Sequence, residues 1–97
     1  MPTYEWLEPF WQDWERLTAV QQRQFLRAVA RFVEDLSVGQ GFRAGLRVKG
    51  VQGAEGVFEI TWAPDGRATF HYGGSVREGE PRIVWRRIGT HEVFERQ

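Results

Sequence analysis

The sequence contains no cysteine, only one lysine and two histidines, and no long apolar run. Without cysteine there is no disulfide and no thiolate metal site, and two histidines cannot complete a zinc centre by themselves. No apolar run exceeds four residues, whereas a transmembrane helix needs about 20. Acidic residues interrupt the N-terminal aromatic residues, so this stretch does not resemble a signal peptide. We therefore expect a cytoplasmic protein with no cofactor, no bound metal and no membrane partner.

Charge is balanced overall but unevenly distributed along the chain. The 97 residues include 13 basic and 13 acidic side chains, so no net field attracts the protein to nucleic acid. Residues 3–15 carry acidic charges only, whereas residues 43–49 and 82–87 each contain three bases and no acid. Twelve of the bases are arginines, whose planar guanidinium suits bidentate contacts with phosphate or carboxylate groups. Binding sites for anions are therefore expected in local basic segments.

A change of apolar period near Gly39 separates a helical part from a strand part within one domain, residues 1–97. Pro9 is typical of the first turn of a helix. Thr18 and Gln21 form a capping-box pattern, which predicts a second helix that ends at Gly39. Because about one residue separates the two helices, we expect an αα-hairpin.

The second part predicts four strands, at residues 46–51, 57–62, 67–72 and 82–88. Residues 63–66 form a turn, since proline fixes φ and aspartate and glycine tolerate the positions that follow. Residues 3–7 are a candidate short edge strand. The fold class is then α+β, with the N-terminal αα-hairpin packed on a twisted, mainly antiparallel four-stranded sheet. Its uncovered face would carry Glu59, Thr61, Arg67, Thr69 and His71.

Several segments, in this order, resemble the RelE/ParE superfamily of bacterial type II toxins. They are Leu-Arg-Val-Lys at 46–49, Gly-Val-Phe-Glu-Ile-Thr-Trp at 56–62, Asp-Gly-Arg-Ala at 65–68, Phe-His-Tyr-Gly at 70–73 and Ile-Val-Trp-Arg-Arg-Ile-Gly-Thr-His-Glu at 83–92. The resemblance covers nearly the whole chain. The closing Gly-Thr-His-Glu, residues 89–92, favours the RelE/HigB-like branch.

This resemblance implies a RelE-like fold and an mRNA interferase, a ribosome-dependent endoribonuclease. In such an enzyme a ribose 2′-OH attacks the adjacent phosphate, and no metal is required. A base takes the hydroxyl proton, cations stabilise the phosphate charge and an acid protonates the leaving oxygen. The implied partners are a cognate antitoxin, the ribosome and mRNA, and a homodimer or a toxin–antitoxin heterocomplex is compatible with the chain.

The resemblance also implies the site residues. Arg67 matches the arginine that contacts the scissile phosphate, and His91 matches the position of the general acid. Lys49 and Arg47 match basic strand positions that hold charge or assist deprotonation. Where some members have a glutamate base this chain offers Arg43, and we add Arg43 and Arg86 to the expected RNA-phosphate-binding residues.

Other interpretations remain open from the sequence. The chain could be a non-catalytic ParE-like gyrase inhibitor that acts by protein contact, or an inactive RelE-fold module that dimerises through exposed tryptophans such as Trp6 and Trp11. His71, between two aromatic residues, is interpreted as structural. The arginines at positions 23, 27 and 31 form one helix stripe, interpreted mainly as a solvated face.

Overall fold

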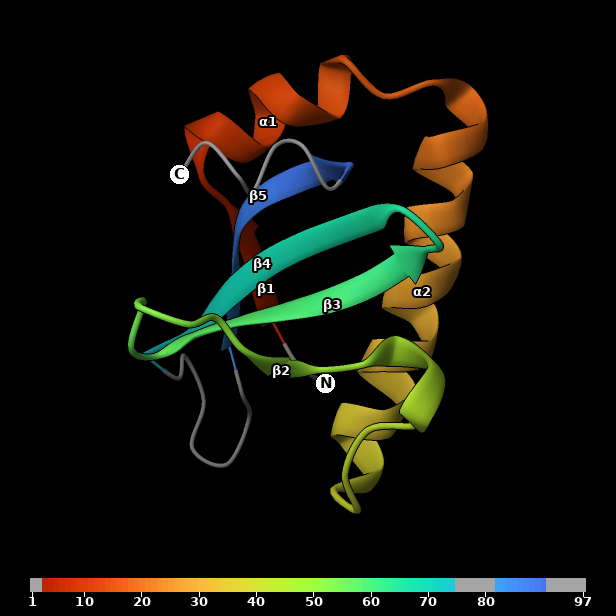
Figure 1. Ribbon diagram of the computed structural model, residues 1–97. Helices are drawn as coiled ribbons and strands as arrows, with labels where there is room; N and C mark the ends of the chain where they lie inside the picture. The colour runs from red at the N-terminus through yellow and green to blue at the C-terminus, as the bar shows by residue number, and fades with distance from the viewer. Residues whose placement is uncertain (1–2, 75–81, 91–97) are drawn as a thin grey trace.

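The structure is a computed structural model that describes residues 3–74 and 82–90 (Figure 1). Its elements, in chain order, are β1 (Thr3–Trp6), α1 (Glu8–Glu15), α2 (Ala19–Val38), the 3₁₀ helix η1 (Ala44–Leu46), β2 (Lys49–Gly50), β3 (Val57–Ala63), β4 (Gly66–Gly73) and β5 (Arg82–Thr90). No helix of the described residues is both long and apolar enough to cross a membrane.

The two helices begin and end where local chemistry dictates. Pro9 lies in the first turn of α1, where its missing N–H costs no hydrogen bond. At the start of α2 the Thr18 hydroxyl accepts from the Gln21 backbone N–H, while the Gln21 side chain accepts from the Thr18 N–H. The helix ends at Gly39, whose φ of 76° is readily adopted only by glycine. The predicted capping box and helix end are confirmed.

The described strands form one sheet in the order β1-β5-β4-β3-β2. The three pairings from β5 to β2 are antiparallel, whereas β1 runs parallel to β5. The α+β class and the candidate edge strand at the N-terminus are confirmed, but the sheet has five strands and not four. The strand expected at residues 46–51 is reduced to Lys49–Gly50, because Leu46 belongs to η1 and Arg47 has a left-handed φ of 48°.

One face of the sheet is covered by both helices, which run in different directions (Figure 1). Helix α2 packs on β3, and α1 packs on the end of β5. Between these layers lies an aromatic core; its fully buried members include Phe10, Phe25, Phe32, Phe70 and Trp85. Trp6, expected at the surface, packs against this core, whereas Trp11 is 47% exposed.

A buried carboxylate connects α1 to the last strand. Asp13, 5% exposed, accepts hydrogen bonds from Nε and Nη2 of Arg87 at 2.6 and 3.1 Å, and from the backbone N–H of Ile88 at 3.1 Å. The Asp13 carboxylate raises the pKa of the Arg87 guanidinium above its ordinary value. The ion pair of Arg87 with Asp13 thus fixes α1 to β5.

Candidate functional site

The face of the sheet opposite the helices gathers polar side chains from four strands. Register places four of them in one row, Lys49, Glu59, Thr69 and Arg87. Residues directly opposite in antiparallel strands share a face and have Cβ atoms about 5 Å apart. Because side chains alternate along a strand, Thr61, Arg67 and His71 lie on this same face. We call these seven residues, with Arg86, the polar face.

Arg67 opens β4 immediately after the turn. Its Nη1 donates to the carbonyl oxygens of Ala63 and Pro64, both at 3.4 Å, and of Gly66 at 2.9 Å. One edge of the guanidinium is therefore fixed on the turn. Among the described residues these bonds involve Nη1 alone, which leaves the hydrogens of Nη2 and Nε for another acceptor.

Lys49 faces a carboxylate across the β2–β3 ladder. Its Nζ lies 3.4 Å from Oε1 of Glu59, whose side chain is only 18% exposed, compared with 68% for Lys49. Glu59 is diagonal to both Arg67 and His71 in the register, at a distance of about 7–8 Å that long side chains span. The polar face thus contains a carboxylate among cations, whereas the sequence interpretation gave the deprotonation role to Lys49 and Arg47.

His71 contacts Arg86 at the bulge of β5. Nη1 of Arg86 lies 3.1 Å from Nδ1 of His71. A guanidinium only donates hydrogen bonds, so Nδ1 accepts and neutral His71 carries its proton on Nε2. The contact depends on a register shift between Thr69 and Phe70, which places Arg86 beside His71. Strand alternation could have indicated His71, but not its partner.

The remaining predicted site residues are placed differently. Arg43 lies beside the end of α2, where its guanidinium binds Asp35 at 2.8–2.9 Å and Glu34 at 3.3 Å. Arg47, exposed, follows η1 in the left-handed conformation. His91 lies outside the described residues. The structure therefore brings Arg67, Lys49 and Arg86 to one face and places Arg43 in an ion-pair cluster with α2.

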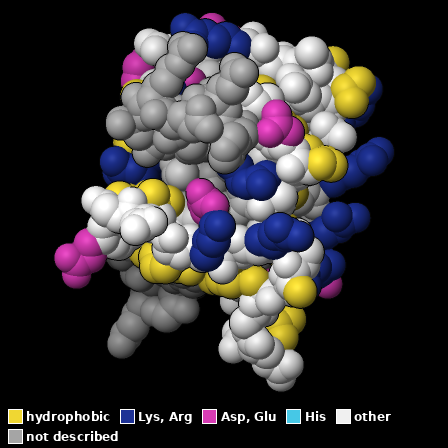
Figure 2. Space-filling view, in the orientation of Figure 1, with side chains coloured by type: hydrophobic (Ala, Val, Ile, Leu, Met, Phe, Trp, Pro, Cys, Tyr) yellow, Lys and Arg dark blue, Asp and Glu magenta, His cyan; other side chains and the backbone are white. Residues whose placement is uncertain are grey.

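Basic side chains also extend beyond the polar face. Figure 2 shows Lys and Arg side chains gathered across the middle of the molecule and toward the side that α2 occupies in Figure 1, with few acidic side chains between them. The exposed arginines of α2 are Arg23, Arg27 and Arg31. Although the net charge is zero, one side of the protein is suited to binding anions.

Solved structures share this architecture. A chain of the E. coli DinJ–YafQ toxin–antitoxin complex aligns with a TM-score of 0.63 and 14% identity, covering 95% of this chain and 94% of that chain. The YoeB/ParE toxin from Agrobacterium tumefaciens aligns with a TM-score of 0.65 and 15% identity, covering 92% and 98%. A chain of the intact E. coli RelBE toxin–antitoxin complex gives 0.60 and 14%, covering 93% and 96%. The predicted RelE-like fold is confirmed.

Sequence comparison adds no relative. No protein-family model matches the chain, and no curated protein matches it at a significant level. The likeness to toxins of toxin–antitoxin systems therefore rests on the fold, which spans nearly the full length of both chains in each alignment.

Proposed function

We propose that this protein is the toxin of a type II toxin–antitoxin system and acts as a ribosome-dependent endoribonuclease. The observation that carries the proposal is the polar face, where Lys49, Arg67 and Arg86 lie with a histidine and a carboxylate on the side of the sheet opposite the helices. Such a face offers both the charge to bind a phosphodiester and the groups to move protons.

In the proposed reaction a ribose 2′-OH attacks the adjacent phosphorus and the bond to the 5′-oxygen breaks, which leaves a 2′,3′-cyclic phosphate and a 5′-hydroxyl. Arg67 and Arg86 bind the phosphate oxygens, with Arg47 nearby along the RNA. Lys49, ion-paired with Glu59, serves as a cation, and the Glu59 carboxylate takes the 2′-OH proton. His91 protonates the leaving oxygen.

His71 supports the same step as a hydrogen-bond donor. Because Arg86 occupies Nδ1, the Nε2–H of His71 is available to a phosphate oxygen. This role replaces the structural interpretation of His71, whereas the ion pair of Arg43 with Asp35 favours a structural role for that arginine in place of RNA binding.

The proposed partners are an antitoxin, the ribosome and mRNA. Two of the solved structures with this fold are toxin–antitoxin complexes, with DinJ and with RelB, which supports an antitoxin partner. The arginine-rich side seen in Figure 2 supports binding to the RNA of a ribosome, because phosphate contacts dominate such affinity.

The test is induced expression of variants followed by primer extension on cellular mRNA. We expect the wild type to produce codon-phased cuts and to stop growth. Arg67→Ala and Glu59→Gln should each lower cleavage roughly 100-fold or more, since each removes a group that acts in the transition state. Gln12→Ala changes an exposed, uncharged residue of α1 and should leave cleavage nearly unchanged.

Full toxicity of both Arg67→Ala and Glu59→Gln would refute the site. Induction of the SOS response without mRNA cuts would instead identify a gyrase inhibitor, the alternative that the sequence leaves open. Absence of growth inhibition by the folded wild type would identify an inactive module of this fold.

A further inference from the structure

Strand β5 has one residue more than β4 over the stretch in which the two strands pair. Thr69 pairs with Arg87, whereas the next residue of β4 pairs with Trp85. Arg86 is therefore an extra residue without a partner on β4, which makes this a β-bulge. Trp85 and Ile88 both belong to the core although they are three positions apart, and an unbroken strand would turn them to opposite faces. The bulge allows β5 to keep both side chains in the core.

The bulge also determines what Arg86 contacts. If the register set by Thr69 continued without a bulge, Arg86 would lie opposite Phe70, whose side chain is fully buried in the core. Nη1 of Arg86 instead lies 3.1 Å from Nδ1 of His71 on the polar face. Bulges are frequent next to active sites, where they redirect a side chain. The contact of Arg86 with His71 therefore depends on where the extra residue lies.

Two buried polar side chains bind the backbone directly after the bulge. Thr69 is 2% exposed, and its hydroxyl oxygen accepts a hydrogen bond from the backbone N–H of Arg87 at 3.1 Å. Asp13, the other buried polar residue of the described chain, accepts from the backbone N–H of Ile88 at 3.1 Å. Burial of a polar side chain is costly unless it is hydrogen-bonded. Both side chains make hydrogen bonds that offset their burial, and these bonds fix β5 next to its extra residue.

The Thr69 hydroxyl selects the position of the bulge. Because the apolar residues on either side face the core, the extra residue of β5 must be Arg86 or Arg87. The hydrogen bond from the Arg87 N–H favours Arg87 as the residue opposite Thr69. Arg86 is then the extra residue, and its guanidinium reaches His71. Without the hydroxyl, this hydrogen bond no longer distinguishes the two arginines.

We propose that Thr69 is a positioning residue of the polar face. Its hydroxyl keeps Arg87 as its partner, which holds the Arg86 guanidinium on Nδ1 of His71 and keeps the ring proton of His71 on Nε2. The consequence for catalysis rests on the proposed function, in which Arg86 and the Nε2–H of His71 bind phosphate oxygens. Thr69 itself touches no reacting atom.

The first measurement is the tautomer of His71 in the ¹⁵N-labelled full chain, from long-range ¹H–¹⁵N correlations assigned with His71→Gln. At about pH 8.5, above the range in which histidines ordinarily titrate, the wild-type ring should carry its proton on Nε2 and show two well-separated nitrogen signals. Thr69→Val removes the hydroxyl and keeps the shape, so Arg86 should leave Nδ1 part of the time and the two signals should converge. Thr69→Ala also lacks the hydroxyl and should give the same convergence.

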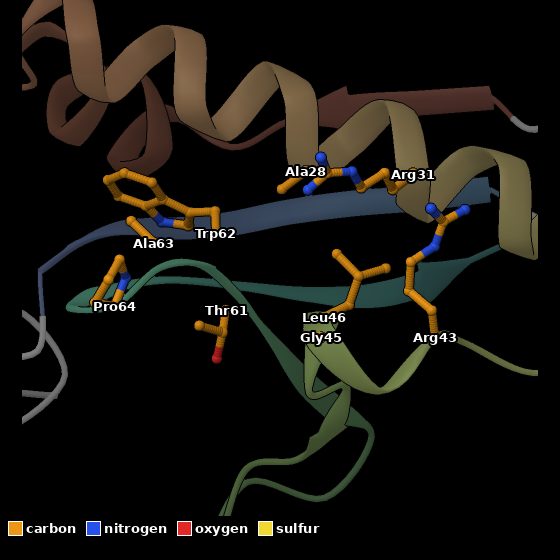
Figure 3. Close-up of a pocket in the computed structure, with 9 residues that line it drawn as sticks. All are labelled: Ala28, Arg31, Arg43, Gly45, Leu46, Thr61, Trp62, Ala63 and Pro64. Atoms are coloured by element: carbon orange, nitrogen blue, oxygen red, sulfur yellow. The ribbon is translucent and has the colours of Figure 1, made fainter.

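Two control variants separate the hydroxyl from general effects of substitution. Thr69→Ser keeps the hydroxyl and loses a buried methyl group, so it should retain the wild-type separation of the two signals although its core is less well packed. Thr61→Val makes the same change on β3, at a pocket of about 500 Å³ that Figure 3 shows between α2, η1 and the end of β3. Because β4 lies between Thr61 and β5, this variant should also leave the His71 signals in place.

The second measurement is the rate of mRNA cleavage on purified ribosomes at saturating toxin. Thr69→Val should lower this rate at least about tenfold, because displaced groups stabilise the transition state less. Thr69→Ser should stay within about threefold of the wild type, since it retains the hydrogen bond. Circular dichroism checks that each variant is folded.

Unmoved nitrogen signals in folded Thr69→Val and Thr69→Ala would overturn the proposal. Equal convergence in Thr69→Ser or Thr61→Val would also overturn it, because it would indicate a general loosening of the sheet. If the wild type does not cleave mRNA but the signals converge in Thr69→Val, the proposed function is refuted and the positioning role stands. If the wild type cleaves mRNA and the signals do not move, the positioning role alone is refuted.

Discussion

At the residue scale, the pair of Asp35 and Arg43 shows how one side chain fixes the chain after a helix. Asp35 accepts from the side chain of Arg43 at 2.8 and 2.9 Å and from its backbone N–H at 2.9 Å. These hydrogen bonds lower the pKa of the Asp35 carboxyl from 3.8 to about 2. The Asp35 carboxylate thereby holds the segment that follows Gly39 against the end of α2.

This pKa predicts a pH dependence of stability. Because the folded pKa lies below the ordinary value, the stabilisation is fully present above about pH 5 and is lost as pH falls from about 4 to 2. The urea midpoint of Asp35→Asn should be below that of the wild type at pH 6, and the two should converge toward pH 2.5. Glu34→Gln removes the partner that is 71% exposed and should show a much smaller change. A constant difference for Asp35→Asn across this range would contradict the assignment.

Sequence reasoning found the polar face because alternation alone determines which strand residues share a side. Alternation assigns Glu59, Arg67 and His71 to the same face of the sheet even when the strands that pair with β3 are not known. It could not find the contact of His71 with Arg86, which depends on a bulge, or the ion pair of Arg43, which depends on how the chain returns after Gly39. Both are contacts between side chains of different elements, and no local pattern specifies them.

At the element scale, local chemistry predicted the helices well and the short strand poorly. The capping box at Thr18 and the left-handed Gly39 are decided within a few residues. The segment expected as a strand at residues 46–51 instead begins in η1 and turns at Arg47, so only two residues pair with β3. Its loose alternation could not distinguish these outcomes, because its conformation depends on packing against β3.

The turn between β3 and β4 yields a prediction for Gly66. A methyl group there would lie 2.5 Å from the Trp62 ring, so Gly66→Ala should displace the indole and lower the free energy of unfolding by about 1–3 kcal/mol. Gly45→Ala is the matched control, because nothing lies within 4 Å of its added Cβ; it should change stability by less than about 0.5 kcal/mol. Urea denaturation followed by tryptophan fluorescence measures both. Equal losses of stability in the two variants would show that the close approach of Gly66 to the Trp62 ring does not restrict the side chain at position 66.

At the scale of the whole molecule, one phenylalanine joins the layers. Phe25 of α2 is fully buried, and its ring centroid lies 5.3–6.5 Å from aromatic rings of α1 and of three strands, Trp6, Phe10, Trp14, Trp62 and Trp85. Aromatic pairs at such separations stabilise a core beyond the apolar area that they bury. Helices and sheet should therefore unfold together.

Phe25→Ala should lower the free energy of unfolding by about 3–5 kcal/mol, a large share of the 5–15 kcal/mol typical of a domain. Leu26→Ala, at a neighbouring position that is 52% exposed, should cost less than about 1 kcal/mol. Circular dichroism and tryptophan fluorescence should give coincident transitions for both variants. Separate transitions would show that α2 and the sheet are independent units.

The parallel pairing of β1 with β5 has a consequence for biosynthesis. The partners Thr3 and Arg82 are far apart in the sequence, and Nη2 of Arg82 donates to Glu5 of β1 at 2.8 Å. A ribosome synthesises β1 long before β5, so β1 must wait until residues 82–85 have been made before it meets its partner. A nascent or truncated product that lacks β5 therefore leaves β1 without the strand that it pairs with.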